Sequence, residues 1–281
     1  MEYKELNNKI IINDLSQFNI NQIFDCGQIF RYFINEDIAW VVSKNKFAKI
    51  ITSKNEVEIL TNDTDYFINF FDLDRDYELI KNKLKKDDFL KPCIDFGFGI
   101  RILKQDLFEL IVSFIISANN NIKRIKNSLN FLAEKYGDKI DTNLGNYHAF
   151  PTLNQFKKIP VESYVEAGLG YRAEQLFKTI QFLTEEKLNS FQYLSVDEQK
   201  EFLLSLSGVG PKVANCIMLF SGNNLKSFPV DTWINKVYNH INKTNITDRK
   251  VIEKELCEKY GDLAGFAQQY FFYFYRENKL N

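Results

Sequence analysis

A glycine turn between two helical patterns constrains the fold of this chain more than any other feature. Residues 207–210 read Ser-Gly-Val-Gly and separate an amphipathic pattern that ends at Leu206 from one that begins at Pro211. Proline suits the first turn of a helix, where its missing N–H would have no partner. We therefore predict a helix-hairpin-helix over about residues 195–222. Three apolar side chains are expected to pack it: Leu206, Val209 and Ala214.

The same turn offers groups that can bind an anion and attack carbon. Free N–H groups around Gly208 and Gly210 can hold a phosphate at the helix start. Lys212 stands in the first helical turn, where the helix dipole disfavours its charge, so a shielded amine here loses its proton and becomes a nucleophile. Asp231 follows nineteen positions later and can stabilise a sugar cation or an imine. The alternative is a solvated lysine beside an ordinary connecting turn.

The rest of the chain divides into a strand-rich and a helix-rich part. Short β-branched and aromatic runs at 29–34, 38–43, 47–52 and 57–60 predict an antiparallel sheet. Helical periodicity follows residue 98, at 107–117, 122–135, 173–184, 196–206, 212–220, 248–260 and 263–275. Ser195 and Glu198 form a predicted capping box. We expect an α+β fold, with an antiparallel β domain over residues 1–98 and a mainly α-helical body over 99–281.

Composition excludes several classes of protein. The 281 residues are 45% hydrophobic, which suits a globular chain of two or three compact parts. The formal net charge is −1, so a nucleic-acid site must be a local basic face. The four cysteines form no C-x-x-C pair, which argues against a thiolate metal site or a redox dithiol: Cys26, Cys93, Cys216 and Cys257.

The chain also lacks sequence signals for export or membrane insertion. Its N-terminus has no signal-peptide pattern, and its most apolar stretch, residues 107–118, is too short to cross a bilayer and contains Glu109. We expect a cytoplasmic protein with no membrane contact. Its abundant Ile, Lys, Asn, Phe and Tyr indicate an AT-rich genome, which points to a bacterial source.

The hairpin and the later Pro229-Val230-Asp231 resemble the helix-hairpin-helix GPD superfamily of DNA glycosylases. Segments 26–31 (CGQIFR), 117–124 (SANNNIKR) and 168–173 (GLGYRA) resemble its 8-oxoguanine DNA glycosylase branch, and 264–268 (AGFAQ) also fits. The resemblance implies a two-lobed helical body. It also implies that Lys212 is the nucleophile and that Asp231 assists it.

The resemblance further implies how the damaged base is recognised. The Gly27 carbonyl would accept a hydrogen bond from N7–H of 8-oxoguanine and repel the N7 lone pair of guanine. Gln268 would read the Watson–Crick edge, and the base would lie between Phe272 and Cys216. Cys216 follows Lys212 by one helical turn, so both project to the same side. The alternative for Phe272 is a core aromatic.

By the same resemblance, other residues hold the duplex. Asn119 would fill the gap left by the flipped base, Tyr171 would wedge beside it, and Arg124 and Arg172 would read the estranged cytosine. The asparagine run also fits a helix N-cap before Ile122. Phosphate contacts are expected from Gly208, Gly210 and Trp233. Relatives commonly carry histidine at this last position, and tryptophan there can donate a hydrogen bond but cannot titrate.

No cofactor is expected, although the hairpin of this superfamily often holds a monovalent or divalent cation through backbone carbonyls. The matching carbonyls are those of Leu204, Leu206 and Val209. The resemblance as a whole implies a monomeric, nucleoid-associated enzyme that excises 8-oxoguanine from duplex DNA and cleaves the apurinic site by β-elimination. Two alternatives stay open: a glycosylase of the same fold for alkylated or otherwise oxidised purines, and a non-catalytic DNA-binding module.

Overall fold

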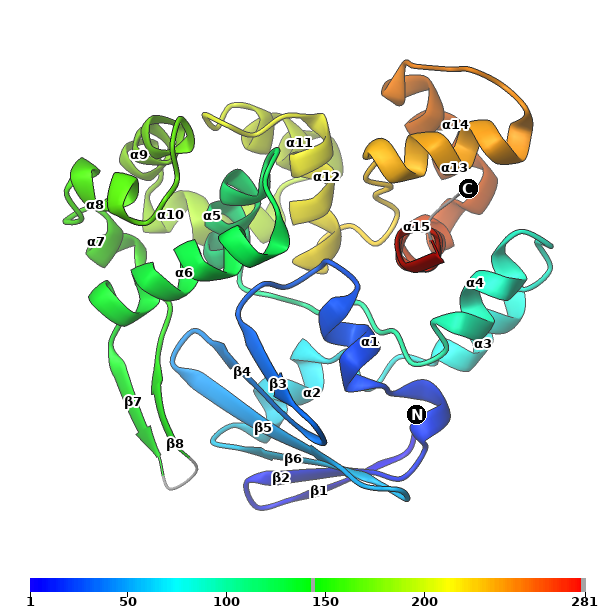
Figure 1. The fold of residues 1–281 in the computed structure, drawn as a ribbon, viewed down its shortest axis with the longest axis horizontal. Helices are drawn as coiled ribbons and strands as arrows, with labels where there is room; N and C mark the ends of the chain where they lie inside the picture. The colour runs from blue at the N-terminus through cyan, green and yellow to red at the C-terminus, as the bar shows by residue number, and fades with distance from the viewer. Residues whose placement is uncertain (143–144, 279–281) are drawn as a thin grey trace.

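The computed structural model describes residues 1–142 and 145–278 and consists of a sheet beneath a helical body (Figure 1). The six-stranded sheet is antiparallel throughout, in the order β1-β2-β6-β5-β4-β3. Its strands are β1 Tyr3–Leu6, β2 Lys9–Ile12, β3 Tyr32–Asn35, β4 Ile38–Ser43, β5 Lys46–Thr52 and β6 Val57–Thr61. The predicted antiparallel sheet is confirmed. The first run begins its strand at Tyr32 rather than residue 29, and β1 and β2 were not predicted.

One face of the sheet carries a core of its own. Ile10, Ile50 and Ile59 lie side by side on β2, β5 and β6 and are fully buried. Helices α1 (Ile20–Asp25) and α2 (Thr64–Phe70) contribute apolar side chains to this core, which keeps the first turn after α1 close to the sheet.

The helical body forms two lobes in Figure 1, with α5 to α12 in one and α13 to α15 in the other. The helices of the first lobe are α5 Leu107–Ser117, α6 Ile122–Tyr136, α7 Leu153–Phe156, α8 Val161–Glu166, α9 Arg172–Phe182, α10 Glu185–Ser190, α11 Val196–Leu204 and α12 Pro211–Phe220. The second lobe contains α13 Thr232–Asn242, α14 Arg249–Tyr260 and α15 Ala264–Asn278. An unpredicted hairpin, β7 Lys139–Thr142 and β8 Gly145–His148, extends from the first lobe beside the sheet.

Helices from the first hundred residues also enter the helical core. α3 (Tyr77–Leu84) and α4 (Leu90–Phe96) bury Tyr77, Leu90 and Ile94 in the same core as the C-terminal helix, and α4 packs directly on α15. Because α1, α4 and α15 are neighbours, the turn that follows α1 faces the last helix of the chain (Figure 1). The boundary at residues 98 and 99 remains a proposal.

The predicted helix-hairpin-helix is confirmed. Ser195 and Glu198 form the capping box of α11, and Pro211 is the first residue of α12. Leu206, Val209 and Ala214 are buried as expected. Within the described ranges, no helix is both long and apolar enough to cross a membrane.

Candidate active site

The hairpin contains two glycines with different structural requirements. Gly208 adopts φ +86°, and a Cβ there would lie 3.0–3.3 Å from side-chain atoms of Gln175, so the folded chain itself requires glycine. Gly210 is the N-cap of α12 with φ −97° and ψ 178°, and a Cβ there would meet no atom within 4 Å. The free N-terminus of α12 is therefore open to a ligand that approaches the backbone.

Lys212 lies one residue into α12, half-buried, with its Nζ 5.6 Å from the centre of the Phe114 ring. Cys216 follows one turn later, as the spacing predicts, and is 4% exposed. Burial raises the pKa of the Cys216 thiol; the Lys212 charge opposes that rise and the Asp231 charge adds to it. The Lys212 amine and the Asp231 carboxylate therefore both lie close enough to Cys216 to influence the pKa of its thiol. The aromatic surface of Phe114 beneath the amine was not predicted, because Phe114 lies in a mostly apolar helix whose pattern does not single it out.

Asp231 is fixed by its own helix. It is the N-cap of α13, and its Oδ1 accepts a hydrogen bond from the Ile234 N–H at 2.8 Å. Both residues lie in the part of the chain that the structure describes, and the Lys212 Nζ and the Asp231 carboxylate oxygens form no ion pair within 4.0 Å. The cap orients the carboxylate and leaves Oδ2 without a cap contact.

Two of the predicted base-recognition residues, Gly27 and Phe272, come from opposite ends of the chain and lie against each other. Gly27 adopts φ +82°, and a Cβ there would lie 2.8 Å from Cε1 of Phe272. Gln268, on the preceding turn of α15, is 4% exposed; its Nε2 donates to the Pro229 carbonyl at 3.4 Å, and its buried Oε1 has no partner in the described chain. A buried acceptor without a donor is costly in a free protein and is suited to a ligand that supplies one.

The three asparagines at the start of α6 have separate tasks. Asn121 is the N-cap, with its Oδ1 accepting from the Arg124 N–H at 3.0 Å, as the N-cap alternative expects. Asn120 donates from Nδ2 to the Ile116 carbonyl at 3.0 Å. Asn119 is exposed and has φ +49°, a conformation uncommon outside glycine. The turn thus presents the Asn119 side chain outward.

The two predicted cytosine readers lie in different environments. Arg124 is exposed on the first turn of α6. Arg172 is 5% exposed, and its guanidinium donates to the carbonyls of Ala118 and Asn119, each at 2.7 Å, and of Leu169 at 3.3 Å. Tyr171 is 58% exposed beside it, with the Arg172 guanidinium carbon 4.5 Å from its ring centre. In this structure Arg172 thus holds the turn that carries Asn119, a contact that the sequence did not indicate.

Comparison with known proteins assigns this arrangement to a family. The family model described as the 8-oxoguanine DNA glycosylase N-terminal domain matches residues 10–111, and the model of HhH-GPD superfamily base excision DNA repair proteins matches residues 112–261. The chain belongs to the 8-oxoguanine DNA glycosylase family.

Individual members of the HhH-GPD superfamily give the same result. A probable N-glycosylase/DNA lyase of Methanothermobacter thermautotrophicus is 32% identical over 232 residues, covering 75% of this chain and 74% of that protein. The N-glycosylase/DNA lyase OGG1 of Arabidopsis thaliana is 33% identical over 208 residues, covering 69% and 57%. The crystal structure of Clostridium acetobutylicum 8-oxoguanine glycosylase/lyase, in complex with double-stranded DNA containing cytosine opposite 8-oxoguanine, has a TM-score of 0.92 at 38% identity and covers 100% of this chain and 99% of that one.

This 8-oxoguanine DNA glycosylase family member carries Trp233 on the first turn of α13, two residues after Asp231. Trp233 is half-buried, and the Lys236 Nζ lies 5.3 Å from its ring centre. At the hairpin, the Leu206 carbonyl accepts from the Val209 N–H at 3.2 Å. No group of three or more His, Cys, Asp or Glu residues able to hold a metal occurs in residues 1–142 and 145–278.

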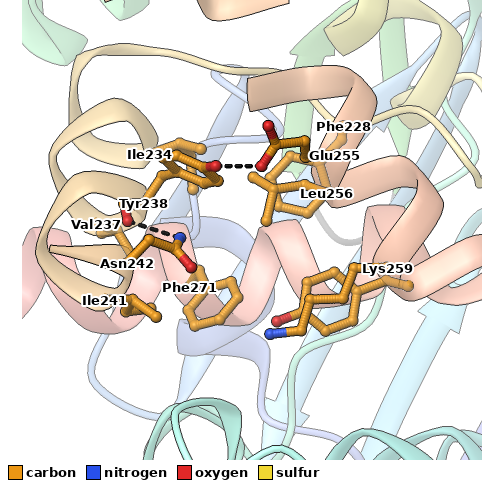
Figure 2. A pocket seen from close by; sticks show the side chains of 11 residues that line it. Phe228, Ile234, Val237, Tyr238, Ile241, Asn242, Glu255, Leu256, Lys259 and Phe271 are labelled. Carbon is orange, nitrogen blue, oxygen red and sulfur yellow. Dashed lines mark hydrogen bonds between the residues drawn. The ribbon is translucent and has the colours of Figure 1, made fainter. Parts of the chain in front are cut away.

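The cavities found in this glycosylase family member lie away from the predicted site. One, of about 80 Å³, lies between α13, α14 and α15, where Tyr238 donates to Glu255 across its wall (Figure 2). Two clefts of about 480 and 680 Å³ border the β7–β8 hairpin and the junction of sheet and helices. The linings of all three contain none of the predicted site residues.

Proposed function

We propose that the chain is a bifunctional glycosylase and lyase that removes 8-oxoguanine from duplex DNA. The observation that carries the proposal is the half-buried Lys212 amine at the open start of α12, with Cys216 and Asp231 around it. The Clostridium acetobutylicum relative supports it through its printed activity and its likeness over the whole chain. A non-catalytic DNA-binding module would need neither the amine nor the carboxylate.

The chemistry follows from these groups. The neutral Lys212 amine attacks C1′ of the flipped nucleotide, the C1′–N9 bond breaks, and the base leaves with the bonding electrons and takes up a proton. Asp231 stabilises the positive charge that develops on the sugar. Loss of an amine proton and opening of the ring give a Schiff base. Removal of a C2′ proton then expels the 3′ phosphate and nicks the strand.

Recognition is assigned to the surface where the chain's ends meet. The Gly27 carbonyl accepts N7–H, the free Oε1 of Gln268 accepts a donor of the Watson–Crick edge, and the base lies between Phe272 and Cys216. Opposing or losing one buried hydrogen bond costs about 1–3 kcal/mol, or roughly ten- to hundredfold in binding. One carbonyl therefore supplies part of the selectivity, and other contacts supply the rest.

The remaining contacts concern the duplex. We assign Asn119 and Tyr171 to the gap in the stack, and Arg124 with Arg172 to the estranged cytosine. Gly208, Gly210 and Trp233 face the backbone phosphates. The proposal also includes an optional monovalent or divalent cation, bound by the backbone carbonyls of Leu204, Leu206 and Val209. We further propose that the protein is a monomer and acts in the bacterial cytoplasm, at the nucleoid.

Borohydride trapping tests the proposal directly. Borohydride reduces a Schiff base, so the wild-type protein should become covalently linked to an 8-oxoguanine duplex, whereas Lys212→Gln should give no adduct. Lys236→Gln, an exposed lysine beside Trp233, is the matched control and should trap as wild type. Trapping by Lys212→Gln would show that another amine attacks. A panel of alkylated and other oxidised purines decides the substrate, and faster excision of one of these would replace 8-oxoguanine.

A further inference from the structure

The backbone carbonyls of residues 25, 26 and 28 accept hydrogen bonds from side chains, whereas the Gly27 carbonyl does not. The Asp25 carbonyl accepts a hydrogen bond from Nη2 of Arg276, and the Cys26 carbonyl accepts from Nε2 of Gln269 at 3.3 Å. The Gln28 carbonyl accepts from Nε2 of Gln105 at 2.9 Å. Within the described chain, the Gly27 carbonyl accepts no hydrogen bond.

Two of these donors come from α15 and hold the upstream side of the turn. Gln269 is 1% exposed, and besides the Cys26 carbonyl it contacts the Cys26 sulfur, with Nε2 at 3.1 Å. Arg276 lies two helical turns later, and its side chain is 16% exposed. The downstream side is held separately, because Gln28 donates to the Arg101 carbonyl and accepts from the Leu103 N–H, each at 2.8 Å.

Arg276 also connects the turn to the ring that faces the base. Its guanidinium carbon lies 5.3 Å from the ring centre of Phe272, the residue one turn before it on α15. Its Nη1 lies 3.5 Å from the position that a Cβ on Gly27 would occupy, is buried, and has no partner among the described residues. One side chain thus contacts the peptide backbone of the turn and the aromatic surface next to it.

We propose that Gln269 and Arg276 are positioning residues for lesion selectivity: from α15 they fix the two peptides before Gly27, so that its carbonyl keeps one direction. This inference rests on the proposed function, since it concerns the carbonyl assigned to N7–H. A carbonyl that can rotate loses its repulsion toward the N7 lone pair of guanine, because glycine at φ +82° has other backbone states within reach. A rigidly held Gly27 carbonyl is therefore needed for this one hydrogen bond to discriminate 8-oxoguanine from guanine.

The two side chains differ from the residues assigned to the base itself. Gln268 and Phe272 lie on α15 beside them and face the proposed base site, whereas the Gln269 amide points to Cys26. Removing the Gln269 amide should therefore leave contacts to the rest of the base intact. The expected defect is specific to the N7 position.

A comparison of two ligands isolates that position. Binding is measured in a Lys212→Gln background, which prevents turnover, to duplexes that contain either 8-oxoguanine or its 7-deaza analogue, in which carbon replaces N7–H. In the parent protein, 8-oxoguanine should bind roughly ten- to hundredfold more tightly than the analogue, which is the effect of losing one buried hydrogen bond. In Gln269→Met and Arg276→Met the ratio should fall below about twofold. In Gln269→Met, whose amide contacts Cys26 and not the proposed base site, affinity for the analogue should change little.

Gln199→Met is the matched control, because Gln199 is a buried glutamine on α11 whose amide donates to the carbonyls of Phe191 and Leu194, remote from Gly27. It should lower the melting temperature without changing the ratio. Arg276→Lys, which keeps one donor, should restore part of the ratio and serves if Arg276→Met does not fold. An unchanged ratio in folded variants overturns the inference. A parent protein that binds 8-oxoguanine no better than undamaged duplex instead overturns the proposed function.

Discussion

Alanine substitutions at Gly208 and Gly210 should separate folding from DNA binding. Gly208→Ala places a Cβ at φ +86° and within 3.0–3.3 Å of Gln175. A non-glycine residue in the left-handed region costs roughly 1–2 kcal/mol. At ~2–4 °C per kcal/mol for a chain of this size, the melting temperature should fall by about 2–8 °C.

Gly210→Ala should leave the stability of the fold nearly unchanged and weaken DNA binding. Its φ of −97° suits any residue, and the new methyl meets nothing within 4 Å. Alanine is a slightly poorer N-cap than glycine, but it also lowers the conformational entropy of the unfolded chain. These two effects on the free energy of unfolding roughly cancel, so stability should change by less than about 0.5 kcal/mol. The methyl would, however, stand where a phosphate approaches the N–H groups of α12. Losing one hydrogen bond to a charged group costs ~1.5–3 kcal/mol, or about ten- to hundredfold in affinity.

The assay pairs thermal melts with fluorescence anisotropy on a labelled 8-oxoguanine duplex, at one fixed salt concentration because phosphate contacts depend on salt. Gly208→Ala is the control for the thermal melts, because its strained φ should lower the melting temperature where Gly210→Ala does not. Wild-type affinity in Gly210→Ala would show that the open helix start is not a phosphate site. A Gly210→Ala protein that melts several degrees lower would refute the analysis of its local geometry.

Two further predictions concern the proposed wedge and a contact between the α3–α4 turn and the end of α14. Asn119→Gly removes the amide without strain at φ +49°, so the melting temperature should stay within about 2 °C while affinity for lesion duplex falls at least about tenfold; unchanged affinity removes the wedge role. Burial acts to raise the pKa of the Asp87 carboxyl, but hydrogen bonds from Lys259 (2.7 Å) and Tyr260 (2.8 Å) hold it below its ordinary value of 3.8. That stabilisation is present above pH 3.8 and is lost as the pH falls through the lower folded-state pKa. Asp87→Asn should therefore lower the melting temperature at pH 7 by ~2–4 °C, for about 1 kcal/mol, and by less toward pH 3; a constant difference would contradict the assignment.

The sequence predicts the elements that carry their own start and stop signals. Helix α5 and strand β4 match the predicted ranges, and α12 differs only in starting at Pro211. Helix α13 was missed, because its asparagines and β-branched residues have low helix propensity. It is held instead by the Asp231 cap and by burial of Ile234 and Val237. Strand β2 was missed although it pairs with β1 in a local hairpin, because its four residues (KIII) show no polar–apolar alternation; its other partner, β6, lies some fifty residues later.

The candidate site shows a similar division. The one-turn spacing of Lys212 and Cys216 follows from the sequence, and the resemblance implies that Gly27 and Phe272 contact the same base. In the structure, a Cβ on Gly27 would lie 2.8 Å from Cε1 of Phe272. The bonds from Arg172 to the carbonyls of the Asn119 turn depend on how two loops meet, and no motif encodes them. The hold of Gln269 on Cys26 joins residues 243 positions apart and is visible only in the folded chain.

The contact between these distant residues has a consequence for how selectively the protein acts on DNA. The proposed nucleophile belongs to a hairpin built from neighbouring residues, whereas the proposed lesion-reading surface forms only when α1 and α15 are docked together. Local unfolding near either terminus would disrupt this recognition surface before it disrupted the hairpin. The reactive amine would then remain with lower selectivity for the damaged base. On the proposed function, firm docking of α15 would therefore protect intact guanine as much as it serves repair.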